Sequence, residues 1–343
     1  MKEERTQRRV DAGEEGKRQK VKVKSEGKPI FLLKDGLSLP FYFYLLPFYF
    51  LLSPRLRVSF LLALLAAFFS CSCSKSSDNG SISHTLTGII RLHSNFHSQF
   101  LQHDRDIIVY LPPGYDRDAG ARYPVLYMQD GQNLFDAATS FFPGMERHMD
   151  ERAQALINDG QIEPLIIVGI YSVPQARLDE YTPTRPARMD RGGKADLYGR
   201  MLVEELKPFI DSHYRTLNGP ENTGLGGSSL GGVVTMHLGL KYSNVFGKLA
   251  ITSPAADWDN RVIVREVNEL GSKVPVKIWL GVGTAEEAEF LESTRELHEA
   301  LLNKGWVQGE DFSYYEAEGA QHSPDYWSRR VDRLLIFLFP KTR

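Results

Sequence analysis

The chain has 343 residues and a formal net charge of −2, and 42% of its residues are hydrophobic. Residues 1–57 carry 13 Lys and Arg against 7 Asp and Glu, whereas the rest of the chain carries 28 against 36. This split predicts a basic N-terminal extension followed by an acidic body, and an acidic body argues against a nucleic-acid partner.

An export signal is predicted at residues 58–73. Arg55 and Arg57 precede an apolar run, and Cys71 follows that run directly. Basic, apolar and small-residue regions in this order are typical of a signal peptide, and the cysteine resembles the lipidated one of a bacterial lipoprotein. We expect an exported protein, lipid-anchored through Cys71 at the cell envelope, periplasmic or surface-exposed. Lipidation of Cys73 and an uncleaved signal anchor are the alternatives.

Outside the predicted signal, the chain divides into three parts. Residues 1–57 are predicted to be disordered or a spurious upstream extension, because a complete signal begins after them. The polar residues 74–85 are predicted to be a tether, and residues 86–343 a single domain. The chain has two cysteines and both lie in the signal, so this domain has no disulfide and no cysteine metal site.

Short β-rich runs alternate with helical patterns along the domain. Strands are expected at residues 107–111, 124–128, 164–170, 222–227, 248–252, 276–280 and 312–316. Helices are expected at residues 197–214, 232–240, 287–303 and 326–339. This alternation predicts the α/β class, with a mostly parallel sheet flanked by helices and sites at the carboxyl ends of the strands.

One motif indicates a nucleophile. Gly227, Ser229 and Gly231 form a G-x-S-x-G pattern between an expected strand and an expected helix, which is the context of a nucleophile elbow. The sharp turn brings the residues two before and two after the serine together, so only very small residues fit there. Ser228 has Leu230 at its +2 position and is therefore the spacer. An ordinary Gly/Ser turn is the competing interpretation.

A serine hydroxyl needs a base to take its proton. His322 follows the last expected strand, where such a base belongs, whereas the other histidines fit packing or surface roles better. His93 and His97 are spaced four apart in a strand-like region, so we expect no metal site there. His148 follows an irregular segment and stays open as a pocket residue.

The base needs an acid to orient it. Glu286 and Glu287 follow the strand expected at 276–280, and either gives the chain order serine, acid, histidine. Glu286 is preferred because Glu287 should already begin the next helix. Asp257 and Asp259 are weaker alternatives, and a serine–histidine dyad also remains open.

Two backbone N–H groups should meet the negative charge that develops on the ester oxygen. The amide of Leu230 follows the nucleophile directly, which is one expected position. Gly131 allows a tight backbone after the strand expected at 124–128, so the amide of Gln132 is the second candidate. An ordinary Asp-Gly turn is the alternative for that loop.

These residues resemble the putative esterase family of α/β-hydrolases, which includes esterase D, enterochelin esterases and feruloyl or acetyl xylan esterases. The resemblance covers residues 86–340. It rests on ordered motifs at residues 105–115, 130–136, 180–183, 205–211, 214–216, 227–231 and 283–286, and on His322 followed by Trp327. The family implies an α/β-hydrolase fold, a triad of Ser229, His322 and Glu286, and an oxyanion hole at Gln132 and Leu230.

The substrate is less defined. Phe135, Arg177, Tyr181 and Trp327 are candidate pocket residues, although Arg177 and Glu180 could form a structural ion pair. Relatives often carry a tryptophan shortly after the motif at 130–136, and this chain does not, so substrate preference cannot be transferred from them.

The sequence therefore predicts a serine carboxylic-ester hydrolase that acts through an acyl-enzyme on carbohydrate-linked or other small esters. It needs no cofactor and no metal, and it meets a membrane only through its lipid anchor or signal segment. An acyltransferase with the same acyl-enzyme is the alternative, and a catalytically silent binding module is a third interpretation.

Overall fold

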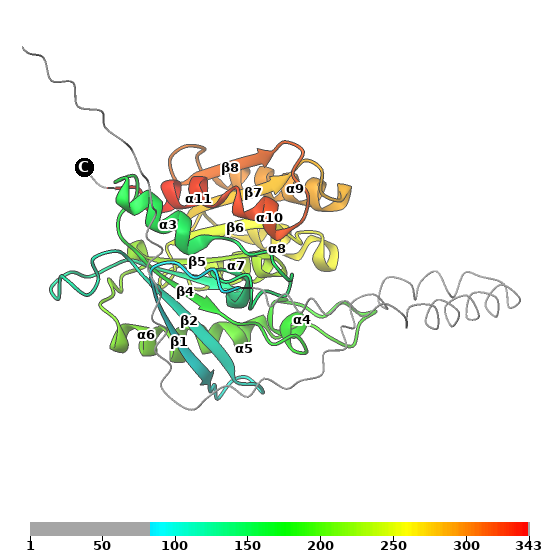
Figure 1. Ribbon diagram of the computed structural model, residues 1–343. Helices are drawn as coiled ribbons and strands as arrows, with labels where there is room; N and C mark the ends of the chain where they lie inside the picture. Colours follow the sequence, from blue (N-terminus) through cyan, green and yellow to red (C-terminus); the bar gives the residue numbers. More distant parts are fainter. Residues whose placement is uncertain (1–82, 342–343) are drawn as a thin grey trace, which may run out of the picture. The chain divides into compact units, whose positions relative to one another are not determined.

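The computed structural model describes residues 83–341 (Figure 1). The predicted extension and signal, Cys71 and residues 74–82 of the predicted tether lie outside the described residues. The last tether residues contact the domain. His84 Nδ1 lies 2.6 Å from Asp136, and Thr85 donates a 2.5 Å hydrogen bond to Glu146.

An eight-stranded sheet forms the centre of the domain. Its strands are β1 (Ile89–Phe96), β2 (Arg105–Leu111), β3 (Val125–Gln129), β4 (Ile166–Ile170), β5 (Thr223–Ser229), β6 (Lys248–Pro254), β7 (Lys277–Gly283) and β8 (Phe312–Ala317). They lie in the order β1-β2-β4-β3-β5-β6-β7-β8. β2 is antiparallel to both of its neighbours, and β3 to β8 are parallel. The α/β-hydrolase fold expected from the sequence is confirmed.

The sheet is buried on both faces, which explains its continuous apolar strands. Successive side chains of a strand point to opposite faces. In β3, Val125 and Tyr127 enter one hydrophobic cluster, whereas Leu126 and Met128 enter the other. Every residue of β4 is buried.

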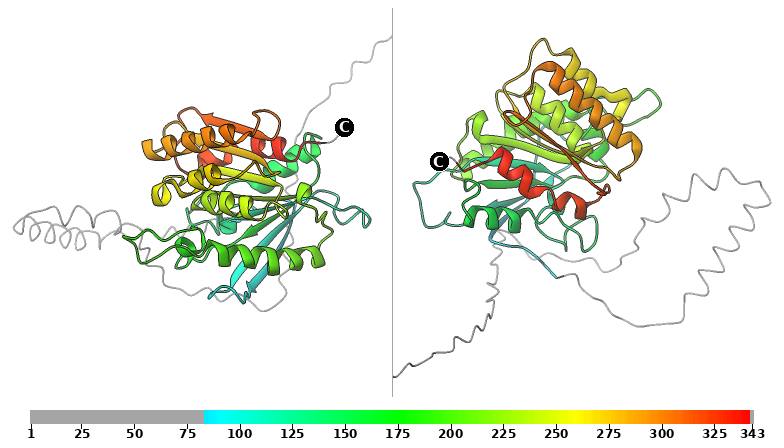
Figure 2. Two further views of the ribbon diagram at one scale, coloured as in Figure 1. Left: turned by 180° about the vertical axis from the view of Figure 1, so that it is seen from behind. Right: turned by 90° about the horizontal axis from the view of Figure 1, so that it is seen from above.

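Helices cover both faces of the sheet (Figures 1 and 2). The first cluster is completed by α5 (Ala195–Arg200), α6 (Lys207–His213), α7 (Leu230–Lys241), α8 (Trp258–Glu269) and α9 (Ala288–Lys304). The second cluster is completed by α3 (Met149–Asn158) and α11 (Val331–Leu338), which pack against each other. Two short helices, α4 (Arg177–Glu180) and α10 (Pro324–Ser328), belong to the loops that carry the site.

Two predicted helices differ in detail from the structure. The helix expected at 197–214 is α5 and α6 joined by a π-helical turn, Met201–Leu206. The closing helix expected at 326–339 is divided into α10 and α11, and Arg330 between them donates a hydrogen bond to Ser253. None of the helices within residues 83–341 combines the length and apolar character needed to cross a membrane.

Candidate active site

Ser229 occupies a strained turn between β5 and α7. Its φ of 56° and ψ of −128° lie in a region that non-glycine residues rarely adopt. Such strain costs on the order of 1–3 kcal/mol and is concentrated at functional sites. A Cβ atom on Gly227 would lie 2.4 Å from the carbonyl oxygen of Gly231, so the two glycines are in close contact. The structure therefore has the tight turn that the motif predicts.

The carboxyl ends of four neighbouring strands meet beside this turn. Ser229 pairs with Pro254 at the end of β6, and its carbonyl oxygen accepts a 3.2 Å hydrogen bond from the amide of Ala255. β7 and β8 continue the parallel order, so the loops after them open at the same edge of the sheet. Glu286 and His322 lie in those two loops.

His322 and Glu286 form a close pair. Nδ1 of His322 lies 2.8 Å from Oε2 of Glu286, whose side chain is wholly buried. Glu287 is exposed at the start of α9. The imidazole packs against Phe290 at 4.6 Å and edge-on against Trp327 at 4.9 Å between ring centroids. The base expected from the sequence thus has a buried carboxylate on one ring nitrogen and aromatic rings around it.

The other oxygen of Glu286 is also bound. Oε1 accepts hydrogen bonds from the hydroxyl of Ser253 and, at 2.8 Å, from the amide of Gly283. Arg330 donates a 2.9 Å hydrogen bond to Ser253 and lies 3.6 Å from the same carboxylate oxygen. Burial alone would raise the pKa of Glu286, but hydrogen bonds to His322 and Ser253 outweigh it and hold the pKa below its usual value. The carboxylate is therefore kept ionised.

Ser253 and Arg330 were not found from the sequence. Ser253 is near the end of β6, with a φ of 45°, and Arg330 lies between two helices. Burial lowers the pKa of Arg330 to about 10 although Glu286 favours its charged form. The sequence does show that Arg330 is a charged residue within an apolar helical pattern. That pattern does not identify the residue that Arg330 contacts.

The two candidate oxyanion donors lie at the starts of helical turns. Leu230 begins α7, and Gln132 lies in a short 3₁₀ turn, Gly131–Asn133. Backbone N–H groups in a first turn have no partner within the helix. The Gln132 side chain donates a 3.0 Å hydrogen bond to the hydroxyl of Ser172 and accepts one of 3.1 Å from the backbone amide of Ser172. The donor loop is thereby anchored to the segment after β4.

Asp130 and Arg177 form a bidentate ion pair beside this loop. The guanidinium donates to the two carboxylate oxygens at 2.7 and 2.8 Å. Burial would raise the pKa of Asp130, yet Arg177 holds it below its usual value. The suggested Arg177–Glu180 ion pair is wrong, because Glu180 binds Arg105 at 2.9 and 3.0 Å in the interior.

The four candidate pocket residues divide into two kinds. Phe135 and Tyr181 are fully buried, and the Tyr181 hydroxyl accepts a 3.2 Å hydrogen bond from the amide of Asp130. Arg177 is partly exposed, and Trp327 packs on His322. Arg177 and Trp327 therefore lie beside the donor loop and the base, whereas Phe135 and Tyr181 belong to the two hydrophobic clusters of the core.

One group within residues 83–341 has potential metal ligands close together. Ligand atoms of Glu146, His148 and Glu151 lie within 4.8 Å of one another. Nδ1 of His148 is 3.5 Å from Glu146 and 3.6 Å from Glu151, which is consistent with simple ion pairing. No metal role follows from an acidic cluster of this kind alone.

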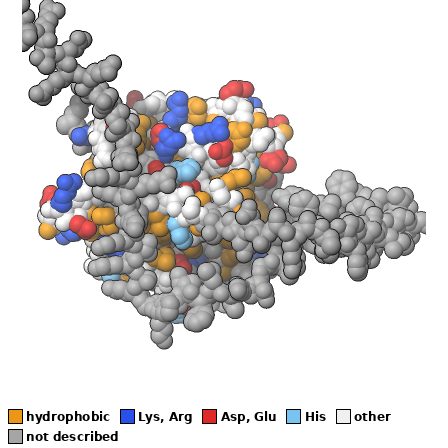
Figure 3. Space-filling model, viewed as in Figure 1, with side chains coloured by type: hydrophobic (Ala, Val, Ile, Leu, Met, Phe, Trp, Pro, Cys, Tyr) orange, Lys and Arg blue, Asp and Glu red, His pale blue; other side chains and the backbone are white. Residues whose placement is uncertain are grey.

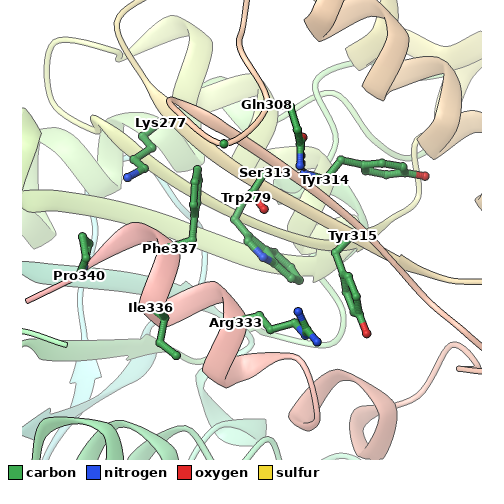
Figure 4. Close-up of a pocket in the computed structure, with 11 residues that line it drawn as sticks. Lys277, Trp279, Gln308, Ser313, Tyr314, Tyr315, Arg333, Ile336, Phe337 and Pro340 are labelled. Atoms are coloured by element: carbon green, nitrogen blue, oxygen red, sulfur yellow. Dashed lines mark hydrogen bonds between the residues drawn. The ribbon is translucent and has the colours of Figure 1, made fainter. Parts of the chain in front are cut away.

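A cavity of about 630 Å³ lies elsewhere, between β7, β8 and α11 (Figure 4). Trp279, Tyr315 and Phe337 line it, and it shares no residue with the site around Ser229. The candidate site is therefore marked by the strained serine and the buried His322–Glu286 pair, and this cavity does not coincide with it.

The chain is similar to known esterases. A family model named Esterase, described as "Putative esterase", matches residues 98–338. An uncharacterized protein of Bacillus subtilis, YbbA, is 27% identical over 252 residues, which cover 70% of this chain and 94% of that protein. An endo-1,4-beta-xylanase/feruloyl esterase of Xylanibacter ruminicola is 27% identical over 236 residues, which cover 67% of this chain and 29% of that protein.

Solved structures share the fold. The BES protein from Bacillus cereus has a TM-score of 0.60 at 23% identity, covering 74% of this chain and 97% of its own. The enterobactin esterase FES from Shigella flexneri has a TM-score of 0.58 at 18% identity, covering 74% of this chain and 60% of its own. With the family model matching most of the chain, these findings show that it belongs to the putative esterase family and is an esterase with an α/β-hydrolase fold.

Proposed function

We propose that the protein is a serine carboxylic-ester hydrolase in which Ser229 is the nucleophile, His322 the base and Glu286 the acid. One observation carries the proposal. A serine held at a φ of 56° stands at the sheet edge where a histidine is paired with a wholly buried, ionised carboxylate. This arrangement activates a hydroxyl that is otherwise a weak nucleophile.

The chemistry follows from these positions. Oγ of Ser229 attacks the ester carbonyl carbon while Nε2 of His322 takes its proton, and Nδ1–H donates to Glu286. The amides of Gln132 and Leu230 bind the oxyanion of the tetrahedral intermediate. The intermediate collapses, His322 protonates the departing alcohol, and an acyl-enzyme remains. Water, deprotonated by the same histidine, then attacks the acyl carbon, and the second intermediate collapses as His322 returns the proton to Oγ of Ser229 and the acid is released. No step needs a cofactor.

We further propose that the substrates are carbohydrate-linked or other small esters. Relatives named as a feruloyl esterase and an enterobactin esterase support this class. Basic and acidic side chains are interspersed over the visible described surface in Figure 3, which suits a small ligand better than a polyanion.

The chain is further proposed to be exported and anchored through Cys71. Mass spectrometry of the native N-terminus would test this, and an unprocessed N-terminus would contradict it.

The test compares two adjacent serines. Ser229→Ala should abolish hydrolysis of short p-nitrophenyl esters, because the attacking oxygen is gone. Ser228→Ala, which removes the same atom one residue earlier, should retain most activity. Circular dichroism should show both variants folded. Wild-type turnover by folded Ser229→Ala would overturn the proposal.

Transfer to an acceptor other than water is the second candidate, because it uses the same acyl-enzyme. Product analysis with and without an added sugar or alcohol separates the two. Free acid as the main product in both cases supports a hydrolase, whereas an acylated acceptor in excess supports a transferase. A silent binding module would hydrolyse no p-nitrophenyl ester and acylate no acceptor.

A further inference from the structure

Arg147 is a buried cation without an anionic partner among the described residues. It is 3% exposed, and its side chain makes no hydrogen bond or ion pair within residues 83–341. Burial lowers its pKa to about 10. A buried charge is costly unless it is paired, so an unpaired guanidinium needs an explanation.

Its position links the two sides of the proposed catalytic centre. The guanidinium carbon lies 4.9 Å above the ring of Trp327, and that ring packs on His322. On the other side, the backbone amide of Arg147 donates a 2.9 Å hydrogen bond to the carbonyl of Asn133, next to Gln132. Arg147 therefore contacts the ring that packs on the base, and its backbone is bonded to the oxyanion donor loop.

Neighbouring acids are already bound. Asp130 favours the charged form of Arg147, but Arg177 occupies both of its carboxylate oxygens. Glu286 is bound by His322, Ser253 and Gly283. The site thus has a cation with free donors, whereas the carboxylates of Asp130 and Glu286 are already bound.

Arg147 follows an exposed loop. Met145, two residues earlier, is 48% exposed, and Phe141 and Phe142 are exposed in the same loop. This loop is tied to the oxyanion side, because the amide of Phe141 donates a 2.9 Å hydrogen bond to Asn133. Arg147 therefore follows a solvent-exposed loop that is bonded to the oxyanion side.

We propose that Arg147 binds a carboxylate of the substrate, so that the enzyme prefers small esters that carry a negative charge. Its planar fork can donate two parallel hydrogen bonds to a carboxylate, and the cation–π contact with Trp327 restrains the guanidinium. The inference rests on the proposed ester hydrolysis and assigns its substrate class.

The experiment uses matched ester pairs that differ by one carboxylate. The first pair places the charge on the acyl part (mono-p-nitrophenyl glutarate against p-nitrophenyl butyrate), and the second on the alcohol part (4-acetoxybenzoate against phenyl acetate). Wild type should show a higher kcat/KM for the charged member of at least one pair. In Arg147→Met this preference should fall roughly tenfold to a hundredfold, as expected for loss of a charge-assisted hydrogen bond.

Two variants serve as controls. Arg152→Met removes an arginine from the exposed part of α3, where it pairs with Asp332 at 3.3 Å, and should leave the preference unchanged. Arg147→Lys keeps the charge without the planar fork and should restore part of the preference. Because the readout is a ratio between two esters, a partial loss of folded enzyme does not affect it.

The outcomes separate this inference from the proposed function. No preference in wild type for either pair, or the same preference in Arg147→Met, would overturn the role of Arg147 while the hydrolase proposal stands. Turnover of these esters by Ser229→Ala would instead overturn the hydrolase proposal. A preference that is lost in Arg147→Met and retained in Arg152→Met supports both.

Discussion

Oε2 of Glu286 lies 2.8 Å from Nδ1 of His322, and the neighbouring Glu287 is exposed at the start of α9. The two glutamates have the same side chain and adjacent positions in the chain. The tight loop that follows β7 places only one of them against the imidazole. Replacing each glutamate with glutamine therefore gives two variants that differ only in the position of the change.

Glu286→Gln should lower kcat on the order of 10³- to 10⁴-fold, because an amide can no longer stabilise the imidazolium or fix its tautomer. Glu287→Gln should change kcat by less than about twofold, since its carboxylate is in solvent. Steady-state kinetics on a short p-nitrophenyl ester measure both. Equal and mild effects would favour a serine–histidine dyad and contradict the role of Glu286.

Ser253→Ala should lower the free energy of unfolding by an amount that depends on pH. The Ser253 hydroxyl helps to hold the pKa of Glu286 low, so its removal should let burial raise that pKa. A carboxyl group with a lowered folded pKa stabilises the fold above its unfolded value of about 4.5, and this stability is lost as pH falls through the folded pKa. The variant's deficit in unfolding free energy should therefore be larger at pH 7 than at pH 3.5.

Urea unfolding at both pH values measures this deficit. Ser293→Ala is a suitable control, because it also removes a buried hydroxyl, but one bonded to backbone carbonyls. Its deficit should be similar at the two pH values. A pH-independent deficit for Ser253→Ala would show that the hydroxyl acts through packing and not through the charge of Glu286.

Gly227→Ala should destabilise the fold, because the new Cβ would lie 2.4 Å from the carbonyl oxygen of Gly231. Overpacking of this kind costs about 1–3 kcal/mol. Gly271→Ala is the control, since its Cβ would meet no atom within 4 Å. Thermal melting should show a lower Tm for Gly227→Ala and little change for Gly271→Ala. Equal melting temperatures would contradict the tight elbow.

Much of the fold could be predicted because its strands have a simple physical signature. Parallel strands buried on both faces must be apolar along their whole length, as β4 is. The antiparallel β1 was not predicted as a strand with defined bounds, because its residues are mostly half-buried and mixed in character. Helix α8 was missed for a similar reason, since its polar residues outnumber its buried ones.

The site was predictable where the chemistry restricts local sequence. Gly227 and Gly231 are required by the turn itself, and His322 and Glu286 follow from the order of the strands. Ser253 and Arg330 were not predictable, because their role depends on contacts between segments 77 residues apart. The charge of Arg330 within an apolar helical pattern marks it as unusual, but it does not identify Ser253 as its partner.

Gln132→Ala should lower kcat with little change in KM. Its side chain anchors the donor loop by two hydrogen bonds to Ser172, at 3.0 and 3.1 Å, and the proposed oxyanion donor is its own backbone amide. Loosening this loop misplaces a donor that acts in the transition state, which costs roughly ten- to a hundredfold. Ser172→Ala breaks only the bond to the hydroxyl and leaves the backbone bond, so its loss of kcat should be smaller. A rise in KM with unchanged kcat in both variants would instead mean that Gln132 contributes to substrate binding and not to the oxyanion hole.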